Sequence, residues 1–366
     1  MNIECVKEKL VYAVSKAEKI TTKNVTLPIL SCILLEAHDS TLTIKSTNLD
    51  LGIEISLPVK VNKPGKIAVS GSILNNFLLN ISDDKNIVLE EIKDNLKIST
   101  KNSQSIIKTF LVDDFPNIPK ISDGKSFQLN TPSLIKGLKS VMYSSSVSTI
   151  RPVLSSILLS SEDDSIIFVA TDSFRLAEKR INTKKKKDFN QILIPFKNTS
   201  EIIRVLDDIK DDVNIQLNDN QISFSYDNLY ITSRIIDGVF PDYKQIIPKE
   251  TKTEVTILKQ DLISSLKISN IFSDKFSQVI FSVIPKEKKF KITTKNLDVG
   301  ESVNNLEAVI KGDSLNISFN YKYITDCFQS IDSDSITLFF SDNNKPMIIK
   351  GVSDKTYMYL VMPMNK

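Results

Sequence analysis

The sequence is poor in the residues on which many enzymes and cofactor-binding proteins depend. Glycine makes up only 9 of 366 residues, and neither GxGxxG nor GxxxxGK[ST] occurs, so the usual phosphate-binding loops are missing. The single histidine, His38, excludes HExxH and other sites with several histidines. Cys5, Cys32 and Cys327 lie far apart with no CxxC, which argues against a disulfide framework or a zinc site. The sequence therefore points away from catalysis, metal ions and cofactors.

Long apolar segments are also missing. No run approaches the ~18–20 residues that a membrane-spanning helix needs. The N-terminal segment 1–16 carries charges throughout, so it predicts no secretory signal. Together with the unpaired cysteines, this predicts a protein of the reducing cytoplasm. His38 lies in segment 36–40, which predicts a solvated hairpin turn.

What is present is the composition of a folded protein. Hydrophobic residues make up 41% and charged residues 25%, which is ordinary for a globular chain. A length of 366 residues predicts two or three domains. The net charge is only +3, and just five of the 47 basic residues are arginine. With so many lysines, a single lysine carries little information about function.

The chain contains a threefold repeat with an offset of about 124 residues. Segment 27–35 resembles segment 151–159, and segment 44–50 resembles segment 292–298. Asn48, Asp172 and Asn296 lie at steps of 124, and Phe-Pro pairs recur at 115–116 and 240–241. Helix-like segments begin at residues 72, 196 and 320, again at steps of 124. Four coincidences in one register predict three homologous domains.

The repeats predict an α+β fold of three homologous domains: 1–122 (N-terminal), 123–248 (central) and 249–366 (C-terminal). In each one a helix comes first, at 5–19, 132–145 and 259–271. Strands with alternating apolar residues follow, such as 41–45 and 52–56, and then the second helix and further strands such as 86–89 and 95–99. Two helices on one face of an antiparallel sheet are the arrangement that this order favours.

The first helix of each repeat has a basic face opposite its apolar stripe. Lys9, Lys16, Lys19 and Lys23 fall within about 80° on a helical wheel of the first repeat. Lys136 and Lys139 do so in the second, and Lys259 and Lys267 form a weaker version in the third. One interpretation is a surface that meets DNA phosphates without reading bases. The alternative is an ordinary solvated helix face in a lysine-rich protein.

Four motifs in this order resemble the bacterial DNA polymerase III beta subunit, the sliding clamp of the replicase. They are LPIL at 27–30, TDSFRLA at 171–177, DGVFPDY at 237–243 and YLVMPM at 359–364. The resemblance spans the whole chain. It implies that two chains join head to tail into a closed ring of six domains around duplex DNA. It also implies that the ring confers processivity on the polymerase and has no catalytic activity of its own.

The resemblance carries residue assignments. Closing the ring would use Ile106, Ile107, Ile271 and Phe272. The DNA-facing set would be Lys9, Lys16, Lys19, Lys23, Asn24, Lys136, Lys139, Lys197, Arg204, Lys259 and Lys267. Here the chain departs from the family, because Lys23-Asn24 stands where many members carry arginine and Phe196 precedes Lys197 where a basic pair is common.

The resemblance further implies a groove between the second and third domains. It would receive short linear motifs of the polymerase, the clamp loader and other partner proteins. The flexible side chains of Met362 and Met364 suit such varied partners. Ser173-Phe174 replaces the family's Gly-His pair and makes this edge of the groove more apolar. The groove would be lined by Leu154, Thr171, Ser173, Phe174, Arg175, Leu176, Pro241, Ile246, Asn320, Tyr323, Pro346, Val361, Met362, Pro363 and Met364.

Two other interpretations stay open at this point. The first is a repeat-built scaffold that binds peptides and whose basic faces serve only solvation. The second is a hydrolase that uses scattered acids such as Asp172 with Arg175, although no nucleophile–base pair has a spacing that implies contact. An Asp172→Asn variant would distinguish the hydrolase from a clamp. An enzyme would lose turnover, whereas a clamp would lose at most partner affinity.

Overall fold

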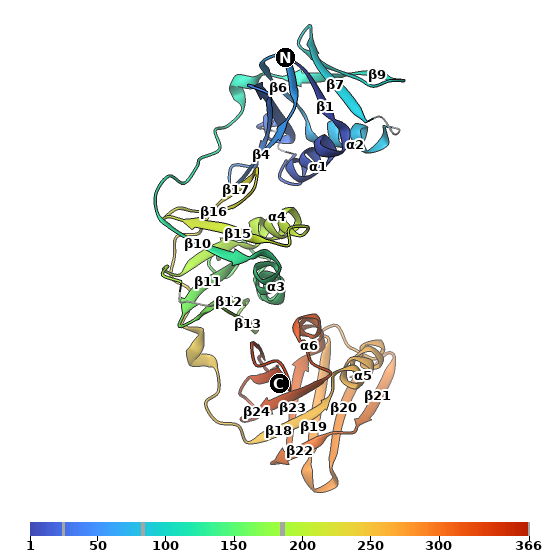
Figure 1. Cartoon of the computed structure of the whole chain (residues 1–366). Helices are drawn as coiled ribbons and strands as arrows, with labels where there is room; N and C mark the ends of the chain where they lie inside the picture. Colours follow the sequence, from blue (N-terminus) through green and yellow to red (C-terminus); the bar gives the residue numbers. More distant parts are fainter. Residues whose placement is uncertain (24–25, 82–84, 184–186, 365–366) are drawn as a thin grey trace. The chain divides into compact units, whose positions relative to one another are not determined.

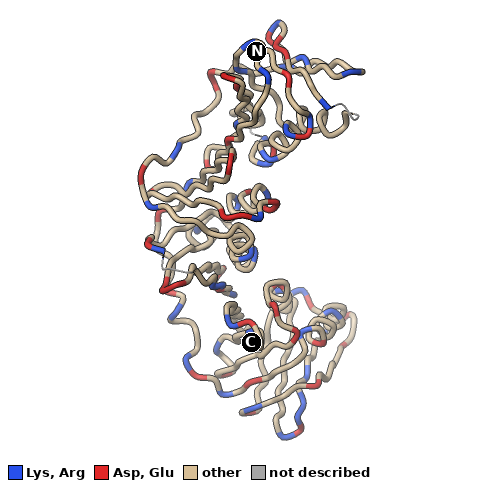
Figure 2. Tube along the Cα trace, in the orientation of Figure 1, with Lys and Arg blue, Asp and Glu red and all other residues tan. Residues whose placement is uncertain are grey.

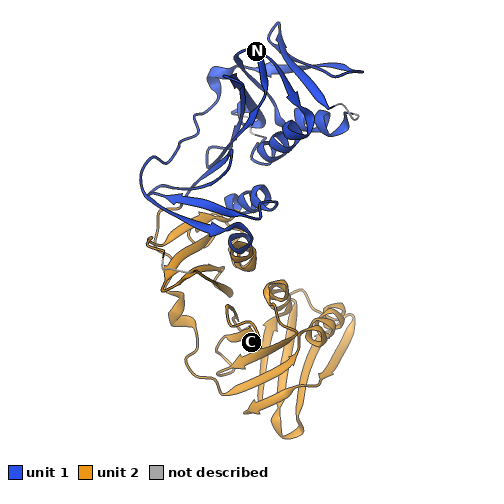
Figure 3. Ribbon diagram, in the orientation of Figure 1, with its two compact units in different colours: residues 1–135, 197–235 blue, residues 136–196, 236–366 orange. Residues whose placement is uncertain are grey.

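In a computed structural model of the chain, the described residues are 1–23, 26–81, 85–183 and 187–364. They form two compact units, shown in blue and orange in Figure 3: residues 1–135 with 197–235, and residues 136–196 with 236–366. The central repeat contributes to both units, because its sheets continue into the repeats on either side.

Unit 1 is built on one run of thirteen strands, in the order β10-β15-β16-β17-β4-β3-β2-β6-β9-β8-β7-β1-β5. All of its pairings are antiparallel, and β17 joins β4 of the first repeat in register from Leu229↔Ile55 to Ser233↔Leu51. The strands are β1 (Asn2–Val6), β2 (Cys32–His38), β3 (Thr41–Thr47), β4 (Leu51–Pro58), β5 (Lys60–Lys63), β6 (Gly65–Ser70), β7 (Asn86–Ile92), β8 (Asn95–Ser99), β9 (Gln104–Phe110), β10 (Lys125–Asn130), β15 (Asp212–Leu217), β16 (Gln221–Tyr226) and β17 (Leu229–Arg234).

Unit 2 contains a nine-stranded sheet, β14-β11-β12-β13-β26-β25-β24-β18-β22, and a four-stranded sheet, β21-β20-β19-β23. The larger sheet crosses from the second repeat to the third where β13 pairs with β26, from Arg175↔Val361 to Lys179↔Tyr357. The strands are β11 (Ser156–Glu162), β12 (Ser165–Thr171), β13 (Arg175–Asn182), β14 (Ile192–Pro195), β18 (Thr253–Leu258), β19 (Gln278–Ile284), β20 (Lys289–Asn296), β21 (Gly300–Leu306), β22 (Val309–Gly312), β23 (Leu315–Asn320), β24 (Ser335–Phe340), β25 (Met347–Gly351) and β26 (Tyr357–Val361).

The helices confirm the expected two per repeat, and the α+β prediction is correct (Figure 1). The second helices begin at residues 71, 196 and 321, within one residue of the predicted starts. In unit 1, α1 packs on β3, β4 and α2, and in unit 2, α5 packs on β20, β21 and α6. The helices are α1 (Lys7–Glu18), α2 (Gly71–Asn80), α3 (Thr131–Val141), α4 (Phe196–Leu206), α5 (Lys259–Ile271) and α6 (Tyr321–Thr325).

The repeated Asn or Asp residues owe their spacing to a recurring turn. After β3, Asn48 Oδ1 accepts hydrogen bonds from the backbone N–H groups two and three residues later (3.1 and 2.8 Å). After β12, Asp172 Oδ1 does the same (2.9 and 3.0 Å), and after β20, Asn296 Oδ1 accepts from the N–H two residues later (2.9 Å). In the first two turns the next residue, Leu49 or Ser173, has a φ of 78° or 79°. A short polar side chain is therefore needed at this position to hold the backbone in the turn.

The smaller predictions agree with the structure. His38 ends β2, and Asp39 and Ser40 form the turn with positive φ values that a tight hairpin requires. The three cysteines are buried and free. Within the described residues, no helix is long and apolar enough to cross a membrane. Basic and acidic residues are interspersed along both units, in agreement with the small net charge (Figure 2).

Candidate functional site

The candidate groove lies in unit 2, on the sheet that joins β13 to β26. An apolar cluster fills this part of the unit and includes the buried side chains of Leu176, Tyr243 and Leu360. Ile247 and Met362 pack against the cluster and stay partly exposed. The cluster forms the floor of the candidate groove. Its partly exposed neighbours contact water and could contact the side chains of a ligand instead.

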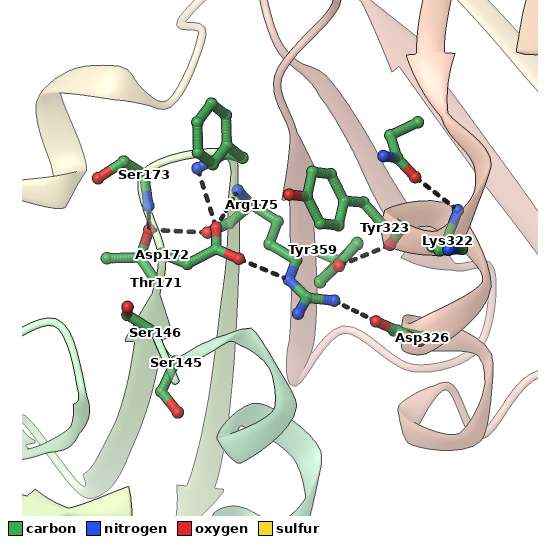
Figure 4. Close-up of polar contacts among 12 residues, drawn as sticks. Ser145, Ser146, Thr171, Asp172, Ser173, Arg175, Lys322, Tyr323, Asp326 and Tyr359 are labelled. Carbon is green, nitrogen blue, oxygen red and sulfur yellow. Dashed lines mark hydrogen bonds and ion pairs between the residues drawn. The ribbon is translucent and has the colours of Figure 1, made fainter. Parts of the chain in front are cut away.

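Arg175, at the start of β13, is the polar centre of the site (Figure 4). Its Nε donates to Asp172 Oδ2 at 3.0 Å, and its Nη1 donates to Asp326, which follows α6. The guanidinium carbon lies 4.8 Å from the ring centre of Tyr323, close enough for a cation–π interaction. Two carboxylates and an aromatic ring therefore hold one arginine in place, and this arginine ties the second repeat to the third.

Phe174 forms one edge of the site. Its ring stacks on Tyr323, with the centroids 6.2 Å apart and the planes 17° from parallel, yet 58% of the residue is exposed. Its carbonyl accepts a hydrogen bond from the N–H of Met362 (2.8 Å), and the N–H of Met364 donates to Ser318 O (2.8 Å). The C-terminal segment is therefore held on both sides of the site by backbone hydrogen bonds.

A cavity of about 640 Å³ adjoins this edge. It is lined by Ile246, Pro346 and Met362 of the predicted set, and by Ile247 and Pro248 of the segment that leads to β18. Five apolar and eight polar or charged residues line the cavity, so a peptide bound there could make both apolar and polar contacts.

The predicted groove residues do not all have the same role. Thr171 and Val361 are buried, and the Thr171 hydroxyl donates to Arg175 O at 2.7 Å, so these two support the site from within. Asn320 Oδ1 accepts from Lys322 N at 3.0 Å and thereby caps α6. Partly or fully exposed positions are held by Leu154, Ser173, Phe174, Arg175, Pro241, Ile246, Tyr323, Met362, Pro363 and Met364.

Two contributors were missed from the sequence. Asp326 anchors Arg175, and Ile247 lines the cavity. No motif marks Asp326, because its role depends on a partner 151 residues away. Ile247 could have been found from its position beside Ile246 in the segment after the DGVFPDY motif.

Buried charges stabilise the same junction. Lys179 Nζ donates to Asp354 Oδ2 at 3.0 Å, and both residues are buried. Burial alone would raise the pKa of Asp354, but hydrogen bonds from Thr356 and Lys179 outweigh it and hold this pKa below its ordinary value of 3.8. Burial and the hydrogen bond to Glu178 raise the pKa of Tyr243 far above its usual range, so this phenol stays protonated as a donor.

The residues predicted to face DNA differ in accessibility. Lys16 is only 5% exposed, and its ammonium donates to Val205 O and to Asp208, so it is not available to phosphate. The helical wheel missed this burial because the covering residues lie 189 positions or more away in the chain. Lys259 donates to Ile331 O at 2.8 Å and is half-buried. Asn24 lies outside the described residues. The exposed members are Lys9, Lys19, Lys23, Lys136, Lys139, Lys197, Arg204 and Lys267.

The predicted interface residues also divide. Ile106 is 68% and Ile271 65% exposed, whereas Ile107 is 6% exposed and belongs to the core. Neighbouring residues of β9 point to opposite faces, so Ile106 and Ile107 cannot both face a partner. Phe272, which follows α5, is half-buried.

The geometry disfavours the hydrolase interpretation. Both carboxylate oxygens of Asp172 are engaged, Oδ1 by two backbone N–H groups and Oδ2 by Arg175 Nε. Asp172 is therefore a turn-forming residue and an anchor. The fold and the site define a binding protein made of repeated α+β domains, with a partner groove at a domain junction.

Comparison with known proteins identifies the family. Models of the N-terminal, central and C-terminal domains of the DNA polymerase III beta subunit match residues 1–119, 128–242 and 244–365. The chain therefore belongs to the DNA polymerase III beta subunit family, the sliding clamps. These clamps are non-catalytic processivity factors, so the expectation of three repeated clamp domains and no enzymatic activity is confirmed.

Individual relatives agree. The beta sliding clamp of Buchnera aphidicola is 28% identical over 96% of both chains, and that of Bacillus subtilis is 25% identical over 98% of this chain and 97% of its own. The crystal structure of the beta subunit from Thermotoga maritima superposes with a TM-score of 0.94 at 25% identity, covering 100% of this chain and 99% of that one. A Pseudomonas aeruginosa sliding clamp bound to griselimycin has a TM-score of 0.94 at 23% identity and covers both chains completely.

Proposed function

We propose that two copies of this chain close head to tail into a ring around duplex DNA and tether the replicative polymerase to its template. The domains in this proposal are residues 1–122, 123–248 and 249–366, and the compartment is the cytoplasm. Topological retention raises the local concentration of the polymerase at the primer end without strong binding to DNA. A separate clamp loader would open the ring.

Two exposed strand edges carry the ring proposal. Within the described residues, positions 104–108 of β9 pair only with β8, and β21 pairs only with β20. Exposed apolar side chains accompany both edges: Ile106 on β9, Val303 on β21 and Ile271 at the end of α5. A bare strand edge invites pairing with another chain, and a closed head-to-tail ring satisfies both edges at once.

Sedimentation equilibrium tests the ring. The wild type should sediment at twice the chain mass of 41.2 kDa and stay dimeric on dilution. Ile271→Lys should weaken the dimer by about 2 kcal/mol or more, because it places a charge in an apolar contact. Val352→Lys is the matched control, since Val352 is 53% exposed on a loop of the same unit. A wild type that sediments as a monomer at every concentration would refute the ring.

The DNA contact is proposed for the exposed basic residues in or next to the helices, which leaves out the buried Lys16 and the half-buried Lys259. Such contacts would be weak and sensitive to salt, which permits sliding. The clamp, once loaded, should stay on nicked circular DNA and leave a linearised copy of the same DNA. Equal loss from both would contradict encirclement and favour the peptide-binding scaffold.

The groove around Arg175, Phe174 and Met362 is proposed to receive linear motifs of the polymerase and other partners. Griselimycin is bound to the Pseudomonas clamp, and we propose that it binds the groove of this chain, for which it then serves as a probe. We expect saturable griselimycin binding by calorimetry and competition by the cognate polymerase subunit. A Met362→Asp variant should bind neither ligand, whereas Val352→Asp should bind both.

A further inference from the structure

Unit 2 has a second cavity. It shares residues 247–249, in the segment that leads to β18, with the cavity beside the groove. Glu178 and Arg180 of β13 lie on the same face of the strand as Leu176, because side chains alternate along a strand. Leu176 belongs to the apolar floor of the groove, so the groove and this cavity share one face of the sheet. The cavity measures about 580 Å³. We call this cavity the basic pocket. Its charged lining residues are Glu178, Arg180, Lys244, Lys249, Lys350 and Lys355.

The basic pocket carries more positive charge than the cavity beside the groove and than a cavity in unit 1. Five cations and one carboxylate line the basic pocket. The cavity beside the groove has three lysines and two carboxylates, and a cavity of about 370 Å³ in unit 1 has one lysine and two carboxylates. A lysine-rich composition would enrich all three cavities alike. The concentration of positive charge is therefore a property of this site.

Part of that charge is neutralised within the protein. Arg180 Nε donates to Glu178 at 2.7 Å, and its Nη2 lies 3.3 Å from Glu162. Lys244 Nζ lies 2.9 Å from Glu162, the last residue of β11. Tyr243 OH donates to the second oxygen of Glu178 at 2.7 Å. These contacts use up both carboxylates and fix the wall of the pocket.

Three lysines of the pocket keep their charge uncompensated. In the described part of the chain, no carboxylate oxygen lies within 4.0 Å of their ammonium groups, and all three residues are exposed. Positive charge gathered in a concave site focuses the field on the ligand and favours an anion with several charges. These residues are Lys249, Lys350 and Lys355.

The basic pocket adjoins the proposed groove. Ile247, Pro248 and Lys249 line both this pocket and the cavity that contains Met362. One short segment of chain therefore separates the two, and a ligand that occupies the groove can extend across it. Ile246, Pro346 and Met362 of the neighbouring cavity can contact apolar groups, whereas the net positive charge of the pocket beyond it favours negative groups.

We propose that the basic pocket binds carboxylate side chains of an acidic segment that flanks the apolar motif of a partner protein. This inference rests on the proposed groove for its occupant, since the partner would enter through it. Lys350 and Lys355 contribute long-range attraction and direct contacts, while Arg180 positions the wall. Recognition would then have two parts, an apolar one in the groove and an electrostatic one in the pocket.

Methyl NMR of the full-length protein tests the pocket apart from the groove. The probe is acetylated tetraglutamate amide, which has no apolar residue for the groove, and tetraglutamine is the neutral control. The methyl signal of Met358, which lines the pocket and not the neighbouring cavity, should shift saturably with tetraglutamate and not with tetraglutamine. Raising the salt concentration should weaken the binding.

Matched variants locate the charge. Lys350→Gln with Lys355→Gln should weaken tetraglutamate binding about tenfold, as expected for the loss of two exposed charge contacts. Lys252→Gln with Lys345→Gln removes the same charge from exposed lysines of the neighbouring cavity and should change the affinity less than about twofold. Methyl signals of the buried core report whether each variant keeps its fold.

Three outcomes would overturn the proposal. The first is the absence of a saturable shift, or equal weakening by both pairs of variants. The second is the same shifts with inorganic phosphate but none with the peptide, which would make this a phosphate site. The third is the same shifts only with duplex DNA. None of these outcomes affects griselimycin binding, so a failure of the pocket is distinguishable from a failure of the groove.

Discussion

The junction of the first two repeats in unit 1 and the junction of the last two in unit 2 have the same backbone but different side chains. In unit 1, Asp50 O accepts from Arg234 N at 2.8 Å, and in unit 2, Phe174 O accepts from Met362 N at 2.8 Å. The strand pairs β4–β17 and β13–β26 follow directly from these turns. The same backbone arrangement therefore joins the first repeat to the second and the second repeat to the third.

The side chains decide what each junction does. Leu51 of the first is buried at 1% exposure, whereas Arg175 at the equivalent place is paired with two carboxylates and stacked on Tyr323. Asn198 seals the first junction by donating to Ser233 Oγ at 2.9 Å. The polar groups of the first junction, such as Asn198 and Lys16, are buried against one another or the backbone, so this junction only joins domains. A junction with an exposed aromatic edge and a polar anchor can also bind a partner.

Removing the buried cation of the second junction should have the largest effect. Lys179→Met leaves Asp354 buried without its cation and should cost about 3 kcal/mol. Ile55 occupies the equivalent place in the first junction, and Ile55→Val should cost only about 1 kcal/mol. Hydrogen exchange should show lost protection in β26 for the first variant and in β17 for the second. Equal, small losses would mean that the two junctions are energetically alike. Adding Asp354→Asn to Lys179→Met should recover part of the loss.

Exchanging the turn residues should alter binding without altering the fold. Phe174→Asp gives the second turn the residue of the first, and griselimycin affinity should fall about tenfold because an apolar contact is lost. Asp50→Phe is the reciprocal control and should leave the affinity unchanged. Calorimetry measures both. An unaffected Phe174→Asp variant would remove Phe174 from the binding edge.

Relaxing the strained turn residue should have a similar effect at both junctions. Ser173→Gly and Leu49→Gly each place glycine at a φ near 78°, where other residues are strained. Each should stabilise its unit by about 1 kcal/mol or slightly less, since glycine also gains entropy in the unfolded chain. Denaturation followed by hydrogen exchange measures the gain, and a loss at either site would show that the side chain matters more than the strain.

Acid should weaken the second junction through Asp354, and this effect is the smallest. The folded pKa of Asp354 lies below the unfolded value of 3.8. Its stabilisation is therefore complete above pH 3.8 and is lost as the pH falls through the lower, folded value. Methyl NMR from about pH 5 down to about pH 2 should show β26 loosening below pH 3.8, as Asp354 becomes protonated. In Asp354→Asn this acid step should disappear.

Local features of the fold were predictable from the sequence. The helix starts near 71, 196 and 321 follow from apolar periodicity, and the turns at Asn48 and Asp172 follow from their short polar side chains. These features depend on residues within a few positions of one another. The Ser173-Phe174 edge of the groove was named from the sequence through the resemblance of the TDSFRLA motif to the family.

The threefold repeat and the α+β class were determined by the sequence itself, because both follow from local periodicity and spacing. The groove motifs were identified through their resemblance to the family. The tertiary structure alone decided that Lys16 is buried against Asp208, that Ile107 faces the core and that Asp326 anchors Arg175. It alone gathered Lys249, Lys350 and Lys355 around one pocket. Each of these outcomes depends on residues far apart in the chain, and only folding brings their charges and surfaces within reach of one another.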